Sequence, residues 1–296
     1  MATLRTLIRN RWRWVVAIIG LAAIAAVTLR RGPHTAREFL ARGDDAIRRG
    51  HTAAAILDYR NAVRLAPNDV TSHRKLADAY MATDDLRHAY EEYTRITDLA
   101  PADLDARVAA GRVLLATGDV AGARDRARDV LARQPTHRSA VLLADITDGR
   151  LRIASGDPTG AADEFRQAIR LAPTEAEPHV LLGEVLVAGG DADAGLTELL
   201  HALRLAPDDE LANRAMGWYY VTTDRRREAE PYFRRAASGA VDRYHSGLAL
   251  ADYLLAERRT DEARHVLEHM TGRDAAAADV RLSALTSRWA DMKTTP

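Results

Sequence analysis

The chain has 296 residues, of which 47% are hydrophobic but only 5% are aromatic, and Ala and Leu are abundant. This composition favours closely packed helices over sheets. The 42 Lys and Arg residues equal the 42 Asp and Glu residues, so no net charge draws the chain to nucleic acid, and the absence of cysteine excludes disulfides, thiolate catalysis and cysteine-bound zinc.

The amino-terminal segment, 1–31, has the pattern of a membrane anchor. Four arginines and no acid lie within residues 1–14, an uncharged apolar run follows up to Leu29, and Arg30 and Arg31 come next. As a helix this run reaches roughly 24 Å, enough to cross a bilayer when flanking Trp and Arg side chains lie at the interfaces. We therefore predict an anchor at 1–31, with a transmembrane helix at about 12–29, and a linker at 32–35.

The charges around this span predict its orientation. More arginines precede it than directly follow it, which favours an amino terminus inside. The chain is then a single-pass protein of the inner (cytoplasmic) membrane, with its main domain periplasmic or extracytoplasmic. Two alternatives stay open. The residues Ala23-Ile24-Ala25 have the form of a signal-peptide cleavage site, and an apolar helix can also lie on a surface.

A regular period organises the rest of the chain. Pro67, Pro101 and Pro135 are equally spaced, the step from Pro173 to Pro207 is the same, and only the step between the two groups is longer, by four positions. Three of the segments are nearly identical: NAVRLAPND at 61–69, QAIRLAPTE at 167–175 and HALRLAPDD at 201–209. Such a period indicates a repeated helical hairpin.

Other columns keep the same period. Small residues recur where two helices must cross closely, mostly large residues recur eight positions before the proline, and a turn residue separates the two helices of each repeat. The small column is Gly43, Ala77, Gly111, Gly149 and Gly183; the large column is Tyr59, Tyr93, Ala127, Phe165 and Leu199; the turn column is Gly50, Asp84, Gly118, Gly156 and Gly190.

These residues resemble the tetratricopeptide repeat (TPR) consensus, W-x2-L-G-x2-Y...A-x3-F...P, which extends over roughly 34 residues. The resemblance implies an all-α, right-handed superhelical solenoid of about seven TPR hairpins over residues 36–277, with a C-terminal capping helix and tail at 278–296. The seven units are 36–69, 70–103, 104–137, 142–175, 176–209, 210–243 and 244–277, with 138–141 as a four-residue insertion.

The consensus tryptophan of the first helix is absent. Its position holds Phe39, His73, Arg107, Asp145, His179, Asn213 and Gly247. Because most of these side chains are polar, we expect looser stacking in the middle units.

In TPR proteins the first helices line a concave face that receives an extended or helical peptide, so the resemblance implies a protein or peptide partner. The family's geometry places the second, fifth, ninth and twelfth residues of each unit on this face. The opposing interpretation is that the apolar residues pack between hairpins and that the arginines pair with acids on neighbouring helices. The candidate partner-binding residues are Arg74, Val108, Arg112, Leu115, Ile146, Arg150, Ile153, Val180, Glu184, Val187, Arg214 and Trp218.

No catalytic motif accompanies the repeats. The sequence has no Gly-rich phosphate loop, no G-x-S-x-G and no H-E-x-x-H, so we predict no enzyme activity, no cofactor, no metal site, no nucleic-acid partner and no small-molecule substrate. The favoured function is a scaffold or assembly factor of the bacterial envelope, anchored in the membrane and binding a protein partner. The alternative is a structural accessory subunit of a larger membrane complex, whose extrinsic surface the repeats cover.

Overall fold

A computed structural model describes residues 35–238 and 246–270, together with residue 280. The predicted anchor at 1–31, nearly all of the linker at 32–35 and, apart from residue 280, the predicted capping helix and tail at 278–296 lie outside these residues. No helix within the described ranges is long and apolar enough to span a bilayer.

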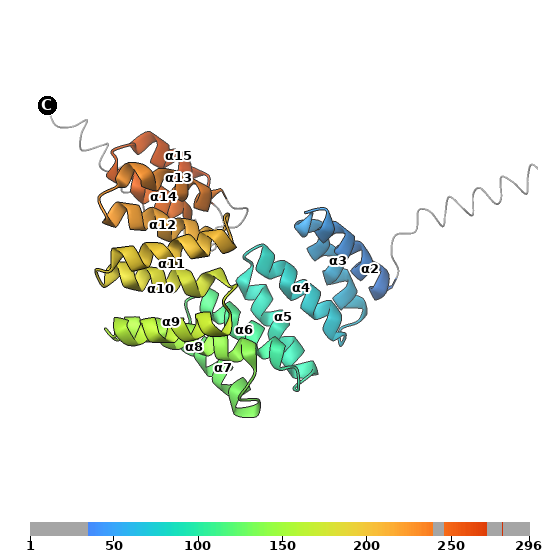
Figure 1. The fold of residues 1–296 in the computed structure, drawn as a ribbon. Coiled ribbons are helices and arrows are strands. Elements are labelled where there is room, and N and C mark those ends of the chain that lie inside the picture. Colours follow the sequence, from blue (N-terminus) through green and yellow to red (C-terminus); the bar gives the residue numbers. More distant parts are fainter. Residues whose placement is uncertain (1–34, 239–245, 271–279, 281–296) are drawn as a thin grey trace, which may run out of the picture. The chain divides into compact units, whose positions relative to one another are not determined.

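The described residues form fourteen helices and no strand, which confirms the expected all-α repeat fold (Figure 1). Consecutive helices pair into seven hairpins joined by short turns. They are α2 (Ala36–Arg48), α3 (Thr52–Leu65), α4 (Val70–Ala82), α5 (Leu86–Leu99), α6 (Leu104–Ala116), α7 (Val120–Arg133), α8 (Arg138–Ala154), α9 (Pro158–Leu171), α10 (Ala176–Ala188), α11 (Ala192–Leu205), α12 (Glu210–Thr222), α13 (Arg226–Ala237), α14 (Ser246–Ala256) and α15 (Thr260–Glu268).

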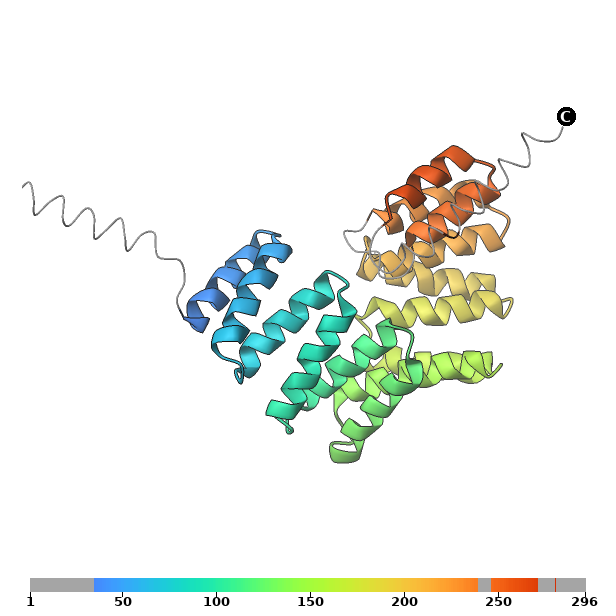
Figure 2. The same ribbon diagram turned by 180° about the vertical axis from the view of Figure 1, so that it is seen from behind.

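The chain divides into two compact units, with the division after Ser72 in the first turn of α4. The described part of the first unit is the α2–α3 hairpin and the start of α4. In the second unit, successive hairpins from α6–α7 to α14–α15 lie side by side, as Figures 1 and 2 show from opposite sides.

The repeated sequence segments around the prolines form the connections between hairpins. In the segment that contains Pro101, the second helix stops at Ala100, whose N–H donates to the Ile96 carbonyl, and the turn delivers Asp103 to the start of α6. The Asp103 side chain accepts a hydrogen bond from the Ala106 N–H, an N-cap worth about 1 kcal/mol. Asp209 caps α12 in the same way. The motif is thus a helix stop followed by a helix start.

The small column marks the crossing inside each hairpin. A Cβ atom added at Gly43 would lie 2.4 Å from the Tyr59 ring, and one added at Gly149 would lie 2.4 Å from the Phe165 ring. At Gly183 an added Cβ would lie 2.8 Å from Leu199. These approaches are closer than real Cβ contacts, so a larger residue at these three positions would force the facing side chain or helix to shift. The prediction that small residues lie where two helices touch is confirmed at these positions.

The turn column has a left-handed backbone. Gly50, Gly118, Gly156 and Gly190 have φ values of 75°, 88°, 81° and 91°, where glycine carries no steric penalty. Three hairpins make the same turn with other residues, because Asp84, Asp224 and Arg258 have φ values of 57°, 60° and 62°. The geometry of the turn is therefore retained even where the residue best suited to it is absent.

The four-residue insertion at 138–141 lengthens a helix. Whereas the other first helices have 11 to 13 residues, α8 has 17 and begins at Arg138. The inserted residues therefore add one turn to the amino end of α8 and do not enlarge the connection before it.

The polar residues at the consensus tryptophan position are buried and bonded. His73 and His179 are 5% and 3% exposed, and the Nδ1 atom of each bonds to a carboxylate on the second helix of its own hairpin, Glu92 and Glu198 respectively. Asn213 is fully buried and donates to the Pro207 and Asp209 carbonyls. These side chains are thus buried with hydrogen bonds, although His179 Nε2 and Asn213 Oδ1 are buried without a partner among the described residues, and looser stacking of the middle units stays a prediction.

Asp145 occupies the same position in α8 but faces acids. Burial raises the pKa of its carboxyl to about 6, the negative charges of Glu164 and Asp148 add to the rise, and Arg170 opposes it. In this hairpin the position therefore holds a charge repulsion where two others hold a His–Glu bond.

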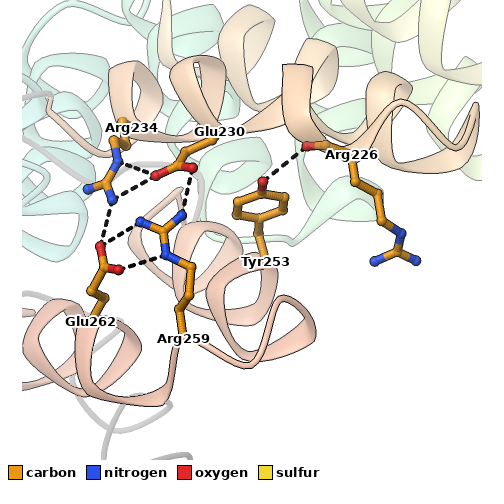
Figure 3. Close-up of polar contacts among 6 residues, drawn as sticks. All are labelled: Arg226, Glu230, Arg234, Tyr253, Arg259 and Glu262. Carbon is orange, nitrogen blue, oxygen red and sulfur yellow. Dashed lines mark hydrogen bonds and ion pairs between the residues drawn. The ribbon is translucent and has the colours of Figure 1, made fainter.

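The hairpins at the carboxyl end share a ring of four charges (Figure 3). Arg234 of α13 bonds to Glu230 at 2.8 Å and to Glu262 of α15 at 2.9 Å, and Arg259 bonds to the same two carboxylates at 2.6 Å each. Beside the ring, the Tyr253 hydroxyl donates to the Arg226 carbonyl over 3.0 Å. Alternating charges held by several hydrogen bonds form a network, which stabilises more than isolated surface pairs do.

Candidate partner-binding site

A cavity of about 320 Å³ opens on the first helices of the second unit. Its walls come mainly from α4, α6, α8, α10 and α12, the first helices of five consecutive hairpins, whose order Figure 1 shows. Five of the predicted partner-binding residues line it: Arg112, Leu115, Ile146, Arg150 and Arg214.

The three arginines of the cavity differ in their partners. Arg150 Nη2 lies 3.2 Å from Glu177 Oε1, an ion pair that joins α8 to α10. Arg112 is exposed and forms no ion pair or hydrogen bond with any described residue. Arg214 likewise has no carboxylate within ion-pair distance in the described chain, and its Nε atom is buried without an acceptor. The cavity therefore presents two cations that the described residues do not neutralise.

The residue that the next unit contributes explains why Arg150 is paired and Arg112 is not. Arg150 is the ninth residue of its unit, and the second residue of the next unit is Glu177. Arg112 is also a ninth residue, but the second residue of the unit after it is Leu143. Arg150 is therefore paired because the next unit contributes an acid at its second position, whereas the unit after Arg112 contributes a leucine there.

Glu184 is a mostly buried carboxylate near two of these arginines. Burial raises the pKa of its carboxyl above the usual value, while the positive charges of Arg214 and Arg150 oppose the rise. It forms no ion pair or hydrogen bond with a described residue. Glu184 therefore lies near Arg214 and Arg150 without forming an ion pair with either guanidinium.

Three predicted apolar contacts belong to the core. Val108, Ile146 and Val180 are 2%, 3% and 0% exposed and belong to core clusters that span neighbouring hairpins; the cluster of Val108, for example, includes Leu143 of α8. The prediction that they add apolar area to a binding surface is wrong for Val108 and Val180, because both side chains are enclosed within these clusters. Ile146 is buried in its cluster but also lines the cavity.

The other predicted residues lie apart from the cavity. Arg74 is paired with Asp103, which bears out the internal-pairing interpretation for this residue. Ile153 is 46% exposed, and Val187 packs against a core cluster. Trp218 is 36% exposed and lies edge-on to Phe233, with ring centroids 5.2 Å apart.

Three more residues of the wall, Met81, Leu143 and Glu177, fall on positions assigned to the concave face but were not among the candidate contacts. Glu177 was the acid to expect opposite Arg150, had the first helices been compared between units. Leu142 lies at the start of a unit, and Thr117 and Gly118 belong to a turn, so none of these three falls on a position assigned to the concave face. Within the described ranges no three His, Cys, Asp or Glu residues are grouped so that they could hold a metal.

Comparisons with known proteins identify the repeat. Two family models, both described as "Tetratricopeptide repeat", match residues 40–103 and 74–138 in one case and 152–219 in the other. Together these matches cover more than half of the chain, and the chain belongs to the tetratricopeptide repeat family. Proteins built from this repeat generally mediate protein–protein interactions, and the fold is typically a non-enzymatic scaffold.

Solved structures agree on the fold. The chain is similar to TTC0263, a thermophilic TPR protein of Thermus thermophilus, with 22% identity, a TM-score of 0.52 and coverage of 63% of this chain and 100% of that one. It is similar to a chain of the APC/C hetero-tetramer Cut9-Hcn1, with 16% identity, a TM-score of 0.56 and coverage of 79% of this chain but only 46% of that one.

A monomeric IFIT1 mutant solved with Gppp-AAAA gives 13% identity, a TM-score of 0.61 and coverage of 88% of this chain and 65% of that one. The chain thus spans less than two thirds of the length of the Cut9-Hcn1 and IFIT1 chains. At these identities the likeness concerns the fold alone. A search of curated protein sequences found no match.

Proposed function

We propose that this protein is a non-enzymatic scaffold or assembly factor that holds a segment of a protein partner in the cavity on its first helices. The observation that carries the proposal is the cavity itself, because five consecutive hairpins contribute to it and two of its arginines lack a carboxylate partner among the described residues. A surface built from several repeats suits an extended ligand, and unpaired guanidiniums suit its polar groups.

Charge reversal at one arginine tests the proposal. Arg112→Glu should weaken partner capture by about 2 kcal/mol, roughly thirtyfold, if the contact is desolvated. Because Arg112 has no partner in the described chain, helicity and thermal unfolding should stay unchanged. Arg150 is a poorer choice, since its reversal would place a third acid beside Glu177 and Glu184.

The matched control is Arg166→Glu, the same change on α9, where Arg166 forms only an ion pair within its own helix at 2.8 Å from Asp163. The full chain and both variants would be purified from source cells in mild detergent, and co-purifying proteins quantified by mass spectrometry. The proposal requires proteins that Arg112→Glu depletes and Arg166→Glu does not. An identical set in all three preparations would contradict it.

We further propose that the scaffold is anchored in the inner membrane by residues 1–31, with the repeats outside the cytoplasm. The arginines before the apolar run and the length of the run support this proposal. A reporter fused after Pro296 should be active outside the cytoplasm, and the chain should resist carbonate extraction. A cytoplasmic reporter signal would reverse the orientation, and a soluble product that begins near Ala26 would support a cleaved signal peptide.

A further inference from the structure

We infer that the segment held in the cavity is apolar and carries a carboxylate that binds Arg112, and that Glu177 is a resident competitor that holds Arg150 until an acidic ligand displaces it. This inference rests on the proposed function and deepens it by naming the chemistry of the occupant.

Several guanidinium nitrogens of the cavity lack hydrogen-bond acceptors in the described part of the chain. The Nε atoms of Arg150 and Arg214 are buried without a hydrogen-bond acceptor, and a buried donor that lacks one costs about 1 to 3 kcal/mol. Arg112 keeps its whole guanidinium available at the rim of the same cavity. A carboxylate is the acceptor that matches a guanidinium fork, because both oxygens can accept parallel hydrogen bonds.

The leucines beside these arginines make part of the cavity wall apolar. Leu115 and Leu142 both line the cavity and are only partly buried, although each also packs against a core cluster. They leave apolar area next to Arg112 that a ligand side chain can cover. A ligand that supplies an acceptor to the guanidiniums and covers the leucines alternates an apolar residue with Asp or Glu.

The acids of the wall decide which anion fits. Glu177 and Asp84 line the cavity, and Glu184 lies close enough to interact with Arg150 and Arg214. A phosphate group carries nearly two negative charges and would meet more repulsion from these acids than a carboxylate would. A carboxylate matches a guanidinium fork with a single negative charge, so we take a carboxylate as the occupant, and the phosphoserine peptide below tests this choice.

Glu177 is placed to compete with the ligand. It projects from the first turn of α10 onto Arg150, and the two side chains are only 23% and 29% exposed. A ligand carboxylate that approaches Arg150 must displace this group. Because Glu177 supplies the same chemistry as the ligand, its removal should strengthen binding, while removal of Arg112 should weaken it.

The test uses a display library of random twelve-residue peptides, selected on the full chain in detergent micelles. The most enriched peptide is synthesised with its acids intact, with each Asp or Glu replaced by its amide, and with each acid replaced by phosphoserine. Affinities for the wild-type chain, Arg112→Gln, Arg112→Lys, Glu177→Gln and Arg166→Gln are measured by fluorescence anisotropy, and thermal unfolding of each variant is recorded.

The acidic peptide should bind the wild-type chain at least tenfold better than its amide twin. Arg112→Gln should abolish this preference, Arg112→Lys should restore part of it, and Glu177→Gln should tighten binding about threefold or more. Arg166→Gln should change nothing, the Arg112 variants should melt with the wild type, and Glu177→Gln should melt somewhat lower because it loses the ion pair with Arg150.

Three results would overturn the inference. Equal binding of the acidic and amide peptides, an unchanged preference in Arg112→Gln, or tighter binding of the phosphoserine peptide would each exclude the proposed occupant while leaving the scaffold function intact. Weaker binding to Glu177→Gln, measured at a temperature where the variant is fully folded, would refute the competitor role. If no peptide is enriched over a blank support, and Arg112→Glu also leaves the co-purifying proteins unchanged, the proposed function itself fails.

Discussion

The crossing inside the α10–α11 hairpin gives a sharp test of the fold. Gly183 of α10 lies against Leu199 and Gly195 of α11, and a Cβ atom added there would meet Leu199 Cγ at 2.8 Å and the Gly195 carbonyl oxygen at 3.1 Å. The second contact is with backbone, so a rotamer change cannot relieve it. Gly183→Ala should therefore push the two helices apart.

Two opposing terms set the size of the effect. Alanine is favoured over glycine in a helix interior by about 1 kcal/mol, which would stabilise the variant. Overpacking costs about 1 to 3 kcal/mol, and the backbone contact at Gly183 places the cost in the upper part of this range. We expect Gly183→Ala to destabilise the chain by about 1 to 2 kcal/mol, a fall of several degrees in the unfolding temperature.

Gly189→Ala is the matched control in the same hairpin. Gly189 is exposed, its φ of −78° suits alanine, and an added Cβ would approach only the carbonyls of Val185 and Leu186 in its own helix, at 3.3 and 3.5 Å. Thermal unfolding followed by circular dichroism should show this variant unchanged or slightly stabilised. If Gly183→Ala also melted at or above the wild-type temperature, helix propensity would outweigh the crossing contact and the phase assigned to these helices would be wrong.

Three further changes test single features of the repeats. Asp145→Asn should stabilise the chain by about 1 kcal/mol at pH 7.5, a value reduced for partial exposure. Because the folded pKa of Asp145, about 6, lies above the ordinary 3.8, this gain should fade in melts recorded as the pH falls through 6. Arg258→Gly should stabilise by about 0.5 to 1 kcal/mol in denaturant titrations, since Arg258 has a φ of 62°, and Gly190→Ala should do the opposite. Arg259 lowers the pKa of Glu230 and Glu262 below the ordinary 4.5. Their charges therefore stabilise the last hairpins above this pH, and hydrogen-exchange protection there should be lost as the pH falls below about 4.5. Glu230→Gln should show less of this loss.

Period and residue size were sufficient to predict the hairpins. A glycine that recurs at one position of the repeat, matched by a large side chain on the second helix, has one simple explanation in a crossing such as that of Gly149 and Phe165. The turn glycines were predictable for the same reason, because few residues tolerate a left-handed backbone. The start of α8 was not, since an insertion of this length can extend either a helix or a loop and the sequence pattern fits both.

The cavity was predictable only in part. Sequence position indicated that Arg112 and Arg150 belong to one face, but their different partners depend on the residue that the next hairpin contributes. Arg74 illustrates the same limit, because its partner Asp103 lies at the far end of the same hairpin, just before the next first helix. Burial was harder still: Val108 and Leu115 are both apolar residues assigned to the concave face, yet only Leu115 reaches the cavity.

Position-specific crosslinking tests the central claim most directly. Thr117 and Thr223 occupy the same place in their hairpins, the residue directly after the first helix, and each hydroxyl donates to a carbonyl of that helix. Only Thr117 lines the cavity. A photoreactive residue at Thr117 should crosslink a protein partner in cells, and one at Thr223 should not. Equal adducts at both positions, or adducts at Thr223 alone, would contradict binding in the cavity.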